Sequence, residues 1–68
     1  MEIDGAFIKL DSFLKAVGAV SSGGEAKMLI LDSQVTVNGE VEERRGRKLR
    51  PGDRVRLGGR EFMVEQGS

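Results

Sequence analysis

The densest group of side chains that could do chemistry is the basic run of residues 44–50, Arg-Arg-Gly-Arg-Lys-Leu-Arg. The planar guanidinium of arginine makes paired hydrogen bonds with phosphate oxygens, and its weak hydration lowers the cost of removing water on binding. Several such groups on one loop would neutralise several phosphates and release counterions, which gives affinity without sequence specificity. The alternative is a basic loop balanced by Glu40, Glu42 and Glu43. This cluster of glutamates could also suggest a cation site, but we expect it to form a solvated hairpin face.

The net charge of the 68-residue chain is zero, but the charges are unevenly distributed. Residues 44–60 contain eight basic side chains against Asp53 alone, a local charge of +7, whereas residues 1–43 carry −5 and residues 61–68 carry −2. A polyanion responds to this local potential and not to the total charge. The neutral composition therefore does not argue against a nucleic-acid partner.

Two further groups could hold an anion. Ser22, Gly23 and Gly24 stand before Glu25 at an expected helix start, where free N–H groups and the positive end of the helix dipole favour an anion. The ordinary alternative is a capping box made by the serine and the glutamate. Three lysines beside the apolar helix stripes either extend a phosphate-binding face or are simple surface lysines: Lys9, Lys15 and Lys27.

The residue types exclude most catalytic arrangements. The chain has no cysteine and no histidine, so it has neither a Ser-His-Asp triad nor a usual zinc ligand set. Its glycines match neither common phosphate-binding motif. We expect no enzyme, no cofactor and no metal, and a small enzyme using only carboxylates and lysines is the least favoured alternative. Because the chain starts with acidic residues and has no long apolar run, we expect a cytoplasmic protein without a membrane span.

The elements that must position these groups can be read from apolar spacing. Residues 10–17 repeat apolar side chains at i, i+3, i+4 and i+7, which predicts a helix that ends at Gly18. A second helix is expected from Ser22 to about residue 31 or 32, joined to the first by a short turn. Residues 2–3 and 6–8 could be short extended pieces.

Beyond residue 34 the period of the residue pattern changes from 3.6, which is typical of a helix, to two, which is typical of a strand. The runs 35–37 and 40–42 flank Asn38-Gly39, the strongest short hairpin signal, and the runs 54–57 and 61–65 flank Gly58-Gly59. Two helices followed by a small antiparallel sheet predict an α+β fold in a single domain over residues 1–68. We expect all three phenylalanines, Phe7, Phe13 and Phe62, to lie in the core.

Four segments in this order resemble the S4 RNA-binding domain: residues 9–18, residues 22–30, residues 35–39 and residues 49–55. The chain is most similar to the short free-standing bacterial S4 proteins of the YaaA/YbcJ type, including their helix-entry glycine pair and their basic block at residues 44–49. The resemblance covers residues 8–57. It implies the S4 (αL-type) fold, with an RNA surface built from the helix pair and nearby loops and without catalytic activity.

Two positions depart from the family pattern. Many S4 domains have arginine after the helix-entry serine, where this chain has Gly23 and Gly24, which puts one interaction with phosphate in doubt. Ser33 stands where glycine often follows the second helix, and a positive φ there would cost serine about 1 kcal/mol or more.

The expected function is therefore non-catalytic binding of structured or double-stranded RNA, with ribosomal RNA favoured, by a monomer that takes no small-molecule substrate. Because all three phenylalanines are expected in the core and none on the surface, we expect recognition of backbone and shape and not of unpaired bases. The alternative is a protein-interaction module whose basic loop docks on an acidic ribosome-associated partner. The candidate RNA-binding residues are Lys9, Lys15, Ser22, Gly23, Gly24, Lys27, Asn38, Arg44, Arg45, Arg47, Lys48 and Arg50.

Overall fold

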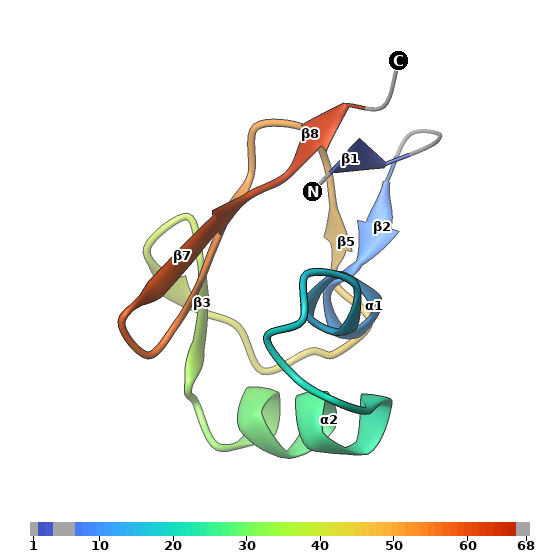
Figure 1. Cartoon of the computed structure of the whole chain (residues 1–68). Helices are drawn as coiled ribbons and strands as arrows, with labels where there is room; N and C mark the ends of the chain where they lie inside the picture. Colours follow the sequence, from blue (N-terminus) through green and yellow to red (C-terminus); the bar gives the residue numbers. More distant parts are fainter. Residues whose placement is uncertain (1, 4–6, 67–68) are drawn as a thin grey trace.

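The computed structural model describes residues 2–3 and 7–66, with two helices packed on one side of a small sheet (Figure 1). Helix α1 spans Leu10–Ala16 and helix α2 spans Gly23–Leu31. Both predicted helices are confirmed within one residue at each end. The α+β class predicted from the sequence is confirmed as well.

Each helix ends in the same hydrogen-bonded turn, although the residues at the turn differ. Gly18 has a φ of 75°, and the N–H of Ala19 donates to the carbonyl of Leu14 at 3.0 Å. Ser33 has a φ of 60°, and the N–H of Gln34 donates to the carbonyl of Leu29 at 3.1 Å. Both turns have the hydrogen-bond pattern of a Schellman motif, in which the residue after the cap is left-handed. Ser33 therefore has the positive φ that was considered from the sequence.

The main sheet has four antiparallel strands in the order β4-β3-β6-β7. Asn38 and Gly39, with φ of 53° and 85°, make the tight turn predicted between β3 and β4. Two small pairs accompany this sheet: β1 runs parallel to β8, and β2 runs antiparallel to β5. The strands are β1 Glu2–Ile3, β2 Ile8–Lys9, β3 Val35–Val37, β4 Glu40–Val41, β5 Lys48–Leu49, β6 Arg54–Leu57, β7 Arg60–Met63 and β8 Glu65–Gln66.

Two strand predictions need correction, and one strand was missed. The predicted run 61–65 is divided into β7 and β8, because Val64 leaves the sheet to exchange hydrogen bonds with the 52–53 turn. Strand β5 was not predicted at all, since two residues show no periodicity. The expected extended piece 6–8 is a strand only from Ile8, and Ala6 lies outside the described residues.

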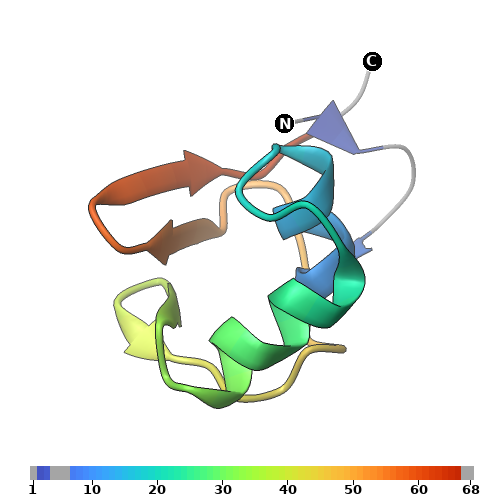
Figure 2. The same ribbon diagram turned by 60° about the horizontal axis from the view of Figure 1, so that its bottom comes forward.

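The core lies between the two helices and the inner face of the sheet, as Figure 2 shows from a second direction. Phe13 is fully buried, and its ring meets that of Phe62 edge-on at 6.4 Å between centroids. Phe62 is partly buried against the core. Phe7, however, is 41% exposed, so the prediction that all three phenylalanines are core residues is wrong for this one. Eleven buried apolar residues form the core among the described residues: Leu10, Phe13, Leu14, Val20, Ala26, Ile30, Val35, Val37, Leu49, Val55 and Val64.

Candidate nucleic-acid interface

The short ladder between β2 and β5 joins two basic segments that are far apart in the sequence. Ile8 pairs with Leu49, and Lys9 pairs with Lys48. Leu49 is fully buried and fixes the ladder to the core, while both lysines are exposed. Like charges directly opposite each other in a ladder are unfavourable. An anion placed between these two lysines would relieve that repulsion.

The basic loop is also tied to the first turn of α1. The N–H of Leu10 donates to the carbonyl of Arg47 at 2.9 Å, and the N–H of Asp11 donates to the carbonyl of Arg45 at 3.1 Å. Helix starts have N–H groups without partners inside the helix, and here the loop supplies the acceptors because Lys9 provides no side-chain cap. The backbone of residues 45–47 is therefore fixed beside Lys9.

Glu42 organises the arginine side chains of this loop. It is buried, only 7% exposed, and its carboxylate accepts hydrogen bonds from the backbone N–H and the Nε of Arg44, both at 3.2 Å, and from Nη1 of Arg47 at 2.8 Å. The side-chain hydrogen bonds from Arg44 and then Arg47 lower the pKa of Glu42 from 4.5 to about 2. The same pairing raises the pKa of Arg44.

This arrangement corrects the predicted solvated face of three glutamates. Glu40 and Glu43 are exposed as expected, but Glu42 is buried and ion-paired. Its charge offsets part of the charge of Arg44 and Arg47. Arg45 and Lys48 have no ion pair among the described residues, so no carboxylate there offsets their charges.

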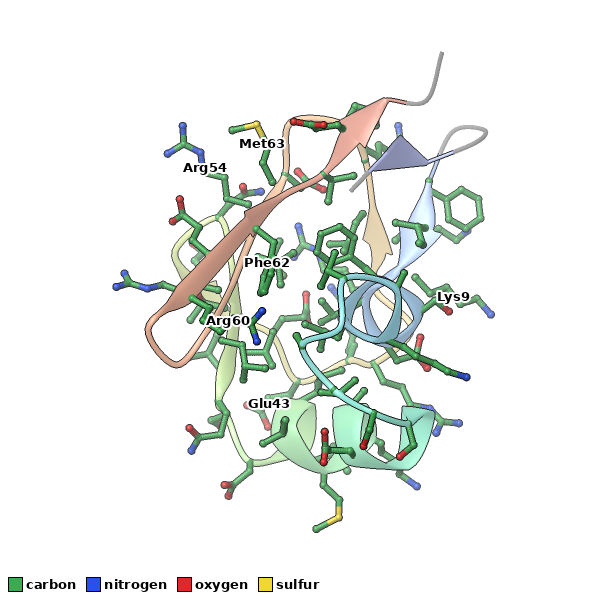
Figure 3. All side chains as sticks on the ribbon, viewed as in Figure 1. Lys9, Glu43, Arg54, Arg60, Phe62 and Met63 are labelled. Carbon is green, nitrogen blue, oxygen red and sulfur yellow. The ribbon has the colours of Figure 1, made fainter. Side chains whose placement is uncertain are left out.

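We use the name basic edge for the cations that the ladder and the loop bring together. A shallow hollow lies within it, lined by Arg44, Gly46, Arg47 and Lys48. Figure 3 shows the Lys9 side chain extending away from the molecule on the side of β2, opposite the side on which Arg54 lies. The basic edge consists of Lys9, Arg44, Arg45, Arg47 and Lys48.

The helix-entry segment forms the cap that the sequence also allowed. The Oγ of Ser22 accepts from the N–H of Glu25 at 3.2 Å, and the carboxylate of Glu25 accepts from the N–H of Ser21 at 3.0 Å. Gly23 and Gly24 are exposed, and the start of α2 lies toward the same side of the molecule as β2 and β5 (Figures 1 and 2).

The remaining candidate residues are not joined to the basic edge by any described interaction. Lys15 and Lys27 are exposed on the two helices, and Arg50 is exposed in the turn after β5. Asn38 lies in the β3–β4 hairpin, where its side-chain amide donates to Asp53 at 3.1 Å and accepts from the N–H of Arg54 at 3.0 Å. The structure thus brings Lys9 to the basic loop and places Asn38 elsewhere.

Sequence reasoning missed two features of this region. Glu42 looked like its exposed neighbours, because a run of charges carries no signal of which one is buried. Phe7 precedes β2 directly, and its exposed ring has Nζ of Lys48 at 4.9 Å from its centroid. Only the β2–β5 pairing, which the sequence did not reveal, places this ring beside the basic loop.

Comparisons with known proteins agree with this architecture. A family model described as S4 domain matches residues 1–65. The chain is 44% identical over 59 residues to a Bacillus subtilis (strain 168) protein named "Probable ribosome maturation protein RlbA", covering 87% of this chain and 83% of that protein. Neither helix in the described ranges 2–3 and 7–66 is long and apolar enough to cross a membrane.

Proposed function

The chain belongs to the S4 domain family, and from this premise we propose that it is a non-catalytic module that holds structured RNA, in particular ribosomal RNA, through the basic edge. The observation that carries the proposal is the β2–β5 ladder, which gathers Lys9 and the loop cations of a neutral chain into one group. The relative's name, which refers to ribosome maturation, supports ribosomal RNA as the partner and the cytoplasm as the location.

The physical basis is local neutralisation of phosphates. The basic edge contains five cations, and Glu42 is the one buried carboxylate within hydrogen-bonding distance of them among the described residues. Each phosphate that meets an arginine or lysine releases condensed counterions, so affinity depends on salt concentration. Because these cations bind the phosphate backbone, the module would read the shape of the RNA more than its sequence.

The test is the salt dependence of binding to a structured RNA, such as a fragment of ribosomal RNA, measured by fluorescence anisotropy. We expect the logarithm of affinity to fall steeply with the logarithm of salt concentration. Lys9→Ala and Arg45→Ala should each flatten the slope by about 0.7 to 0.9 for each phosphate that is no longer neutralised.

Arg54→Ala is the matched control, because it removes the same charge from the opposite side of the molecule (Figure 3). Its slope should stay at the wild-type value. Equal effects of all three substitutions would contradict the basic edge as the binding surface. Absence of RNA binding at low salt, together with capture of an acidic ribosome-associated protein, would favour the protein-docking alternative.

A further inference from the structure

Phe7 differs from the other two phenylalanines in the surroundings of its ring. Phe13 is fully buried, and the ring of Phe62 packs against Phe13 with the guanidinium of Arg60 5.0 Å from its centroid. Figure 3 shows Arg60 beside Phe62 in this way. Phe7 is 41% exposed and lies beside Lys48. Of the three rings, that of Phe7 therefore has the most surface exposed to solvent.

The ring lies beside Lys48, one of the cations of the basic edge. Phe7 is adjacent in sequence to β2, whose Lys9 pairs with Lys48, and the Nζ of that lysine lies 4.9 Å from the ring centroid. A cation over one face of an aromatic ring is attracted to it and helps to hold the ring in place. Only a fixed ring with exposed surface can accept a planar group at little entropic cost.

An exposed aromatic ring beside phosphate-binding cations is the combination that proteins use to hold unpaired nucleotides. The ring stacks on a base, and the cations neutralise the phosphates on either side of it. Phe7 is placed to stack on the base, and Lys48 and Lys9 are placed to neutralise the phosphates beside it. A fully paired helix would leave the ring without a partner, because its bases are stacked inside the duplex.

We propose that Phe7 stacks on one unpaired base next to a paired stem, so that the RNA held by this protein carries an unpaired nucleotide at the edge of a helix. This inference rests on the proposed function, because the stem is held by the basic edge. It replaces the expectation from sequence that unpaired bases are not recognised.

The experiment uses two RNA probes: a blunt hairpin whose strands are joined by a synthetic non-nucleotide linker, so that it has no unpaired base, and the same hairpin with three unpaired nucleotides at its 3′ end. The wild-type protein should bind the second probe more tightly. Phe7→Leu keeps an apolar side chain of similar size, and it should weaken binding of the extended hairpin by about 5- to 150-fold, with binding of the blunt hairpin changed less than about twofold. Phe7→Tyr should retain the preference.

A direct signal is available because the chain contains no tryptophan. Phe7→Trp introduces a single fluorophore, which the extended hairpin should quench and the blunt hairpin should not. Circular dichroism melting of each variant verifies that it is folded.

The outcomes separate this inference from the proposed function. Tight binding of both hairpins with equal affinity, or equal weakening of both by Phe7→Leu, would overturn the stacking role and leave the RNA-binding function intact. Failure of the wild-type protein to bind either probe at low salt would overturn both.

Discussion

Arg44 and Arg45 are neighbours in sequence, but the structure gives them different partners. Arg44 donates to the buried carboxylate of Glu42, whereas Arg45 has no ion pair among the described residues. We therefore predict that Arg45→Ala reduces the slope of log affinity against log salt concentration by about 0.7 to 0.9 and leaves the melting temperature unchanged. Arg44→Ala should reduce this slope by a smaller amount, and it should lower the melting temperature because Glu42 loses a partner.

Anisotropy titrations at several salt concentrations and thermal melts measure the two effects on the same samples. Identical behaviour of the two variants in both measurements would show that the pairing with Glu42 has no consequence for binding.

Glu42 leads to a second prediction, which concerns the stability of the protein at low pH. Its pKa is 4.5 as an ordinary glutamate and about 2 in the fold. A carboxyl group with a lowered folded-state pKa stabilises the protein fully above the unfolded value, and this contribution is lost as the pH falls through about 4.5 toward 2. Because the Arg44 side chain is 78% exposed, solvent screens the pair, and we expect Glu42→Gln to cost about 1 to 2 kcal/mol at pH 7.

The measurement is chemical denaturation of wild type and Glu42→Gln at pH 7, 4 and 2. The difference between their free energies of unfolding should shrink toward pH 2, where about half of the wild-type Glu42 side chains are protonated in the fold. Glu40→Gln is the control on an exposed neighbour and should change little. A difference that is the same at all three pH values would rule out the ion pairs as its origin.

At the scale of elements, the two helices provide an internal comparison of how a helix ends. Both have the same turn, with Gly18 after α1 and Ser33 after α2. A left-handed conformation costs a residue with a Cβ about 1 to 2 kcal/mol, and glycine avoids this cost but loses more entropy on folding. We predict that Ser33→Gly raises the free energy of unfolding by about 1 kcal/mol or slightly less, equivalent to about 4 to 8 °C in melting temperature.

Gly18→Ala is the reciprocal change and should lower stability by a similar amount. A Cβ built at Gly18 meets no atom within 4 Å, so this variant measures backbone conformation without a steric clash. Thermal melts of both variants test the pair. Destabilisation by Ser33→Gly would indicate that the serine side chain makes a contribution that its turn geometry does not reveal.

The elements also show which parts of the structure a single sequence can specify. The helices and the Asn38-Gly39 hairpin were predicted because their signals are local: apolar residues repeat along a few turns, and a tight turn requires particular residues. The β2–β5 ladder was not predicted, because it joins Lys9 to Lys48 through two-residue strands that show no periodicity. The composition of the basic edge, the burial of Glu42 and the surroundings of Phe7 all depend on that long-range pairing or on packing.

At the scale of the whole molecule, binding should depend on where the charges lie, because their sum is zero. Exchanging Arg45 and Glu40, in the double variant Arg45→Glu with Glu40→Arg, keeps both the composition and the net charge. It replaces a cation of the basic edge with an anion and moves the positive charge to the exposed strand β4. We predict that affinity for structured RNA falls by about tenfold or more at low salt, because one phosphate is no longer neutralised and a repulsive charge is added. The single variant Glu40→Arg, which raises the net charge to +2, should bind at least as tightly as wild type; unchanged binding by the exchanged variant would show that the RNA is held elsewhere on the molecule.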